Sequence, residues 1–144
     1  MTSLPSDGKI RDIPQSVRAI ALVGLSANPA RDSNGGFAFL LRRRYRAVGV
    51  NPGLAGQTIH CAPVYARLAD VPFAIDMVDI FRNSEAAGGV VDEALALMPL
   101  PKVIWMQLDV INEAAAENAH AHGVGVVMDR CPEIEIARLE LPKI

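Results

Sequence analysis

Short runs of apolar residues, each closed by a glycine, a proline or a polar residue, recur along the chain. Such runs are typical of parallel strands, because a strand covered on both faces needs apolar side chains on each side. The runs that predict strands cover residues 19–23, 47–50, 74–80, 103–106 and 124–128.

Between these strands the apolar residues return at three- or four-residue spacing, which predicts helices. We expect Ser84 to cap one of them at its N-terminus, with Pro99 and Pro101 beyond its end. The segments that predict helices are 37–45, 84–97 and 110–122, and shorter helices are expected over 64–69 and 134–139. Residues 1–14 show no apolar period, so we expect a flexible arm there and a single domain over 15–144.

Strands that alternate with helices predict an α/β fold, since right-handed crossovers join parallel strands and place helices on the sheet faces. We therefore expect a doubly wound, Rossmann-like sheet of about five parallel strands with helices on both faces. Ligands of such folds bind in the crevice beyond the carboxyl ends of the strands. The segments that follow the predicted strands are 24–34, 51–53, 81–84, 107–109 and 129–132.

Composition removes several classes of function. The chain has 144 residues, of which 51% are hydrophobic and 21% charged, which excludes disorder as its overall state. A net charge of −2 offers no basic surface for nucleic acid or an anionic membrane. No apolar run approaches the roughly 20 residues of a membrane span, and the first fifteen residues lack the apolar core of a secretory signal. The expectation is a soluble, cytoplasmic protein.

The first strand–helix loop is the strongest candidate for an anion site. Gly24 permits a tight turn, Ser33 is the expected helix N-cap, and Gly35 and Gly36 leave room for a ligand. A helix N-terminus attracts phosphate through its free N–H groups. The spacing differs from G-x-G-x-x-G, so an ordinary surface loop with a capping serine is the alternative.

The end of the second strand argues against NAD. NAD-binding proteins of this fold usually have an acidic residue there, which holds the ribose hydroxyls, whereas this chain has Asn51 and Pro52. A nucleotide with a different ribose substitution, such as a 3′-phosphate, remains compatible.

A distinct motif lies at each of the five strand ends. The motifs are Val-Gly-Leu-Ser at 23–26, Val-Asn-Pro at 50–52, Val-Asp-Ile-Phe-Arg at 78–82, Trp-Met-Gln-Leu at 105–108 and Val-Met-Asp-Arg-Cys-Pro at 127–132. They resemble those of small, stand-alone CoA-binding proteins, which are similar to the CoA-binding domain of succinyl-CoA synthetase α subunits, and the resemblance covers about residues 14–138. The resemblance implies coenzyme A as ligand, with the ADP part across the crevice and the phosphates on the first loop. The synthetase's phosphohistidine-bearing domain has no counterpart here, so its ligase chemistry is not carried over.

Together, motif and resemblance select a set of candidate ligand-binding residues. The phosphates are assigned to the first loop and the adenosine to the end of the second predicted strand. Residues after the third predicted strand are expected to form the facing wall of the crevice, and a glutamine after the fourth is expected at its rim. These residues are Gly24, Ser26, Ala27, Arg31, Ser33, Asn34, Asn51, Pro52, Phe81, Arg82 and Gln107.

The arginines fall into two groups by their position relative to the predicted strands. Arg31, Arg82 and Arg130 follow strands, and as a set they favour phosphate contacts over surface salt bridges. The basic run at 42–46 falls at the opposite edge, where cations stabilise a helix C-terminus.

No catalytic or metal site is expected. Cys131 is a candidate nucleophile or disulfide partner of the CoA thiol, and a packing role is favoured. The sequence shows no nucleophile–base pair, and neither cysteine has a second Cys or His at the spacing that metal ligands require.

Three functional hypotheses follow. The first is a module that binds CoA or an acyl-CoA without catalysis of its own. The second is an enzyme, either an NAD(P)-linked oxidoreductase or a subunit of an acyl-CoA transferase or ligase completed by a partner. The third is a regulatory subunit that senses CoA. A homodimer is the default assembly for a domain of this size, and an unidentified protein partner is the alternative.

Overall fold

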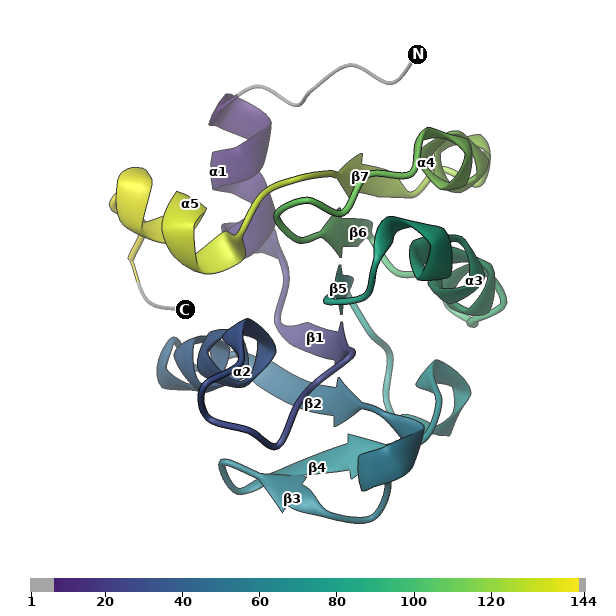
Figure 1. Ribbon diagram of the computed structural model, residues 1–144. Helices are drawn as coiled ribbons and strands as arrows, with labels where there is room; N and C mark the ends of the chain where they lie inside the picture. The colour runs from purple at the N-terminus through teal and green to yellow at the C-terminus, as the bar shows by residue number, and fades with distance from the viewer. Residues whose placement is uncertain (1–6, 143–144) are drawn as a thin grey trace.

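The computed structural model describes residues 7–142, which form a seven-stranded sheet between two layers of helices (Figure 1). The strand order is β3-β4-β2-β1-β5-β6-β7, and every neighbouring pair is parallel except β3–β4. The strands are β1 (Ala19–Val23), β2 (Arg46–Val50), β3 (Thr58–Ile59), β4 (Ala62–Tyr65), β5 (Met77–Ile80), β6 (Val103–Met106) and β7 (Gly125–Val127). The predicted doubly wound α/β fold is confirmed.

The helices divide between the two faces of the sheet. They are α1 (Asp7–Ser16), α2 (Asp32–Arg42), α3 (Ser84–Leu95), α4 (Glu113–Ala121) and α5 (Pro132–Arg138). Side chains of α1, α2 and α5 share one hydrophobic cluster, and those of α3 and α4 share the other. Two single-turn 3₁₀ helices, η1 (Pro52–Leu54) and η2 (Leu68–Asp70), connect the strands at the β2–β4 edge.

Burial explains why the central strands read as apolar runs. All five residues of β1 and all four of β5 and β6 are buried, because each strand has a helical layer on either side. Trp105 in β6 is fully buried, and its indole N–H donates to the Arg130 carbonyl at 2.8 Å. The five predicted strands are β1, β2, β5, β6 and β7.

The prediction was wrong where the sheet is widened. Residues 64–69, expected as a short helix, begin inside β4 and end in η2. In β4 the buried Ala62 and Val64 alternate with the exposed Pro63, which is the two-residue period of a strand with one covered face. The sheet therefore has seven strands where about five are predicted.

The N-terminal segment also differs from the prediction, which was a flexible arm. From Asp7 onward the chain forms α1 and packs against α5, while residues 1–6 lie outside the described part. Ile10 and Val17 are buried to 0% and 1% exposure, so this segment belongs to the core. Pro14 lies inside the helix, and its carbonyl accepts a hydrogen bond from the Tyr45 hydroxyl.

Ser84 is not the N-cap of α3. Asn83 has that position, and its side chain accepts from the Ala86 N–H at 2.8 Å. The Ser84 hydroxyl instead accepts from the Ile111 N–H and donates to the Asp109 carbonyl, which ties α3 to the loop after β6.

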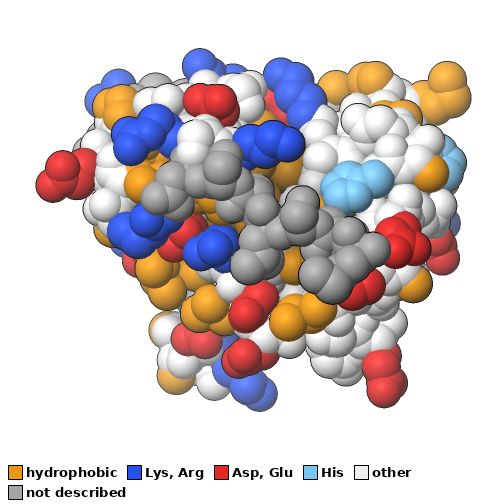
Figure 2. All heavy atoms as spheres, turned by 90° about the horizontal axis from the view of Figure 1, so that it is seen from above, with side chains coloured by type: hydrophobic (Ala, Val, Ile, Leu, Met, Phe, Trp, Pro, Cys, Tyr) orange, Lys and Arg blue, Asp and Glu red, His pale blue; other side chains and the backbone are white. Residues whose placement is uncertain are grey.

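Within residues 7–142 no helix is long and apolar enough to span a membrane. On the face shown in Figure 2, basic and acidic side chains are interspersed. This mixture agrees with the small net charge of the chain.

Asp79 is a carboxyl group in the core. In the register of the sheet it lies between Leu22 of β1 and Trp105 of β6. It is 1% exposed, and its Oδ1 has no hydrogen-bond partner among the described residues. Burial raises the pKa of the Asp79 carboxyl well above its usual range, because the ionised form is poorly solvated there.

Asp79→Asn is expected to change how stability depends on pH. The folded wild type keeps the Asp79 proton to higher pH than the unfolded chain does. Its unfolding free energy therefore falls as pH rises above the ordinary pKa of 3.8, until the raised pKa is passed. The variant lacks this loss, so its melting temperature at pH 7 should exceed the wild type's, with a smaller excess at pH 4.

Thermal unfolding followed by circular dichroism between pH 4 and pH 8 measures this difference, and Asp76→Asn is the matched control. Burial alone raises the pKa of Asp76, but N–H groups of Ala19 and Arg18 bond its carboxylate and, with the charge of Lys102, hold that pKa below its ordinary value. The control should therefore lose stability at neutral pH. Equal pH slopes for the wild type and Asp79→Asn would contradict the assignment.

Candidate functional site

One cavity of the described chain lies where the direction of the crossovers reverses. From β1 the chain passes through α2 to β2 on one side, and from β5 it passes through α3 to β6 on the other. The loops after β1 and β5 therefore separate at their carboxyl ends, which is where doubly wound folds bind ligands. The cavity between them has a volume of about 670 Å³.

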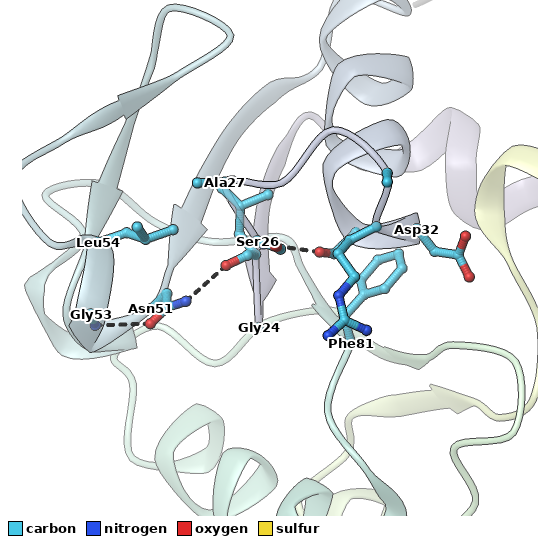
Figure 3. Close-up of a pocket in the computed structure, with 12 residues that line it drawn as sticks. Gly24, Ser26, Ala27, Asp32, Asn51, Gly53, Leu54 and Phe81 are labelled. Carbon is cyan, nitrogen blue, oxygen red and sulfur yellow. Dashed lines mark hydrogen bonds between the residues drawn. The ribbon is translucent and has the colours of Figure 1, made fainter.

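Three segments line this cavity, which we call the loop pocket (Figure 3). They are the β1–α2 loop with the first turn of α2, the end of β2 with η1, and the residue after β5. The lining residues are Gly24, Leu25, Ser26, Ala27, Ala30, Arg31, Asp32, Ser33, Asn51, Gly53, Leu54 and Phe81. Seven of the candidate residues therefore lie together, namely Gly24, Ser26, Ala27, Arg31, Ser33, Asn51 and Phe81.

The β1–α2 loop is shaped by its own hydrogen bonds. The Ser26 hydroxyl accepts from the Asn28 N–H at 3.1 Å, and the Asn28 side chain accepts from the Ala30 N–H at 3.0 Å. In each of these two turns a side-chain oxygen accepts from the N–H two residues further along the chain. Together the two turns fold the loop back toward α2.

The N-terminus of α2 opens into the loop pocket. Arg31 is the N-cap and provides no side-chain cap, so helix geometry leaves the N–H groups of Asp32 and Ser33 without intrahelical acceptors. These donors and the helix dipole favour an anion. The Asp32 carboxylate, which the sequence analysis did not consider, points away from Ser26 and Asn51 (Figure 3).

The expected capping role of Ser33 was wrong. Ser33 lies one residue inside α2, and its hydroxyl accepts from the Ser26 N–H at 3.0 Å. Asn34, which follows, is 4% exposed, and its Nδ2 donates to the Ser26 carbonyl at 2.9 Å. Asn34 is therefore beneath the loop and supports it, while Ser33 both supports the loop and lines the pocket.

Asn51 fixes the loop from the opposite wall. Its Nδ2 donates to the Leu25 carbonyl at 2.8 Å, and its Oδ1 accepts from the Gly53 N–H at 2.9 Å (Figure 3). Both polar ends of the side chain are engaged in holding the loop and η1.

A second cavity adjoins the first on the α3 side and shares Gly24 and Asn51 with it. Its volume is about 480 Å³, and we call it the α3-side pocket. Pro52 and Arg82 line it, and so do Arg67 and Glu93, which the sequence analysis missed. Arg67 belongs to the β4–η2 connection that was expected to be helical, so its position was not open to sequence reasoning.

Gln107 and Arg130 lie elsewhere. Gln107 is 6% exposed and lines a small interior cavity with Asp79 and Cys131, rather than the rim of the crevice. Arg130 pairs with the buried Glu135 at 3.2 Å. Gln107 follows β6 and Arg130 lies after β7. Both strands are further than β1 and β5 from the point where the direction of the crossovers reverses.

The basic run lies at the amino ends of the strands, as its position in the sequence predicts. Arg43 is the C-cap of α2, and its guanidinium donates to the Leu141 carbonyl. Arg46 begins β2, and its guanidinium carbon lies 3.8 Å from the centre of the Phe73 ring. In residues 7–142, no three His, Cys, Asp or Glu side chains are grouped so as to hold a metal ion.

Comparisons with known proteins find a matching family and similar chains. A family model described as "CoA binding domain" matches residues 18–137. The chain is 32% identical over 130 residues to "Uncharacterized protein YneT" of Bacillus subtilis (strain 168), covering 90% of this chain and 93% of that protein.

Solved structures include two informative neighbours. A hypothetical protein from Pyrococcus horikoshii OT3 is 31% identical, with a TM-score of 0.88 and coverage of 97% of this chain and 98% of the other. The dinucleotide forming acetyl-coenzyme A synthetase 1 of Ca. Korarchaeum cryptofilum, in complex with phosphate and ADP, is 23% identical with a TM-score of 0.66. The similarity covers 81% of this chain but 27% of the synthetase, and it shows a shared fold.

Gly24→Ala is expected to destabilise the loop pocket. Gly24 has φ +94°, and a Cβ there would lie 2.5 Å from the Phe81 carbonyl oxygen. The variant should lower the unfolding free energy by about 2–3 kcal/mol. Gly35→Ala is the control, since no atom lies within 4 Å of its added Cβ, and it should change stability by less than about 1 kcal/mol. Urea unfolding measures both, and a Gly24→Ala protein as stable as the control would refute this.

Proposed function

The chain belongs to the CoA binding domain family, and on that premise we propose that it binds coenzyme A, or an acyl-CoA, through its ADP moiety. The site is the pair of adjoining pockets at the carboxyl ends of β1, β2 and β5. The observation that carries the proposal is the open N-terminus of α2, where free N–H groups and Arg31 line the loop pocket.

The diphosphate is assigned to the loop pocket. The N–H groups of Asp32 and Ser33 and the guanidinium of Arg31 supply donors from the α2 side. Anions at a helix N-terminus gain both hydrogen bonds and a favourable dipole interaction. Gly24 keeps this approach free of a side chain, because its position admits no Cβ.

The adenosine is assigned to the α3-side pocket. Pro52 and Val90 offer apolar surface for the base, while Arg67 and Arg82 bring positive charge to the same pocket. Arg67 pairs with Asp70 at 3.1 Å, which leaves Arg82 as the better donor for a 3′-phosphate. With volumes of about 670 and 480 Å³, the two pockets fall within the range of cofactor sites.

The state of Asn51 favours CoA over NAD. The diol of NAD is usually held by a carboxylate at the end of β2, but this chain has the amide of Asn51, whose two ends already bond Leu25 and Gly53. The 3′-phosphate of CoA requires donors instead, and Arg82 supplies them.

Binding without catalysis is the function we propose for this chain alone. The two hydroxyls at the loop pocket, those of Ser26 and Ser33, accept hydrogen bonds from backbone N–H groups within the loop. In the described part of the chain no imidazole or carboxylate is hydrogen-bonded to either hydroxyl, as an activated nucleophile requires. The pantetheine arm would extend from the loop pocket toward solvent or a partner protein.

Calorimetric titration with CoA, dephospho-CoA, NAD and NADP tests the ligand. We expect a Kd for CoA in the micromolar range and about tenfold weaker binding of dephospho-CoA, since one charge-assisted contact is lost. Tighter binding of NAD or NADP would favour an oxidoreductase. Absence of CoA binding would overturn the proposal.

Arg31→Ala tests the diphosphate position. Removing one exposed charge-assisted contact should weaken CoA binding by about tenfold. Arg42→Ala is the matched control, because Arg42 is exposed at the opposite end of α2. It should bind CoA like the wild type. An Arg31→Ala protein with unchanged affinity would remove Arg31 from the site.

A further inference from the structure

His60 lies at the tip of the β3–β4 hairpin, which turns back toward the N-terminus of α2. His60 and the adjoining Cys61 have φ values of +50° and +66°, a left-handed conformation that costs residues with a Cβ about 1–2 kcal/mol each. This turn brings the imidazole against α2, where its ring centre lies 6.4 Å from that of Phe37.

The imidazole bonds the side chain that supports the β1–α2 loop. His60 Nε2 lies 2.8 Å from Asn34 Oδ1, and Asn34 Nδ2 donates to the Ser26 carbonyl at 2.9 Å. Because the amide presents its nitrogen to Ser26, its oxygen faces His60, and Nε2 of His60 must be the donor.

We propose that His60 is a positioning residue for the β1–α2 loop, acting through Asn34 on Ser26; the role rests on the proposed function of that loop in binding CoA. Neither His60 nor Asn34 lines the loop pocket. The effect is therefore on the position of the loop rather than on contact with the ligand.

The physical reason is the choice of amide orientation. An asparagine side chain can rotate by 180°, which exchanges its donor and its acceptor. Rotation would place Asn34 Oδ1 against the Ser26 carbonyl oxygen, and this contact between two acceptors would be repulsive. The Ser26 carbonyl therefore selects the amide orientation, and Nε2–H of His60 stabilises it by donating to Asn34 Oδ1.

Ser26 is the point at which this support matters. Its N–H is bound by the Ser33 hydroxyl and its carbonyl by Asn34, so two successive residues of α2 hold both sides of one peptide segment. Ser26 and Ala27 line the loop pocket directly. A loosened Ser26 would move the loop away from the arrangement that leaves the pocket open to a diphosphate.

Three variants separate a hydrogen-bonding role from others. His60→Ala removes the donor and should weaken CoA binding about three- to tenfold, as expected for loss of one part-buried hydrogen bond. His60→Gln restores an N–H donor without a ring and should remain within about twofold of the wild type. Asn34→Ala combined with His60→Ala should weaken binding no more than Asn34→Ala alone, since both act through one chain of contacts.

His122→Ala is the matched control, because His122 Nδ1 contacts the Asn118 carbonyl at the end of α4, on the other face of the sheet. If His60→Gln binds as weakly as His60→Ala, the positioning role is refuted. Normal CoA binding by His60→Ala would also refute it. Failure of the wild type to bind CoA would overturn the proposed function instead.

Amide hydrogen exchange tests the same inference without a ligand. The Ser26 N–H, which is held by the Ser33 hydroxyl at 3.0 Å, should exchange about three- to tenfold faster in His60→Ala than in the wild type or in His60→Gln. Equal exchange rates in all three proteins would overturn the proposal whether or not CoA binds.

Discussion

The β1–α2 loop has to leave a fully buried strand, satisfy its buried polar backbone and still keep donors open at the N-terminus of α2. A few side chains meet the first two demands. Asn51 holds the Leu25 carbonyl, and Ser33 and Asn34 hold the N–H and carbonyl of Ser26. These contacts use side chains of α2 and Asn51 and leave the first backbone N–H groups of α2 free for an anion.

Close backbone packing fixes where this loop begins. The Gly24 N–H donates to the Val50 carbonyl, and the Phe81 N–H donates to the Val23 carbonyl, so β2, β1 and β5 remain paired up to the crevice. Leu25 then turns into the core against Gly49, where a Cβ would lie 2.4 Å from a Leu25 methyl carbon. The floor of the loop pocket is thus made of hydrogen-bonded strand ends, and the segment between Ser26 and Arg31 forms one wall.

The widened edge of the sheet connects fold and site. The β3–β4 hairpin adds two short strands beyond β2, and its contribution to the site is indirect. One end supplies His60, which contacts α2, while the following connection supplies Arg67 to the α3-side pocket. An extension that looks peripheral therefore supports the loop of one pocket through His60 and lines the other through Arg67.

The sequence by itself determined the central sheet, its helical layers and the segments at the switch point, because buried parallel strands leave uninterrupted apolar runs. The expectation of a flexible arm overlooked Ile10, Ile13 and Val17, whose spacing is helical; Ile10 and Val17 are buried, and α1 forms although Pro14 lies inside it. Only the tertiary structure decided the rest: Ser33 and Asn34 support the loop, Gln107 and Arg130 do not line the loop pocket, and His60 reaches α2. The supporting roles of Ser33, Asn34 and His60 depend on side chains that meet across 7 to 26 residues of chain, and local spacing does not encode such contacts.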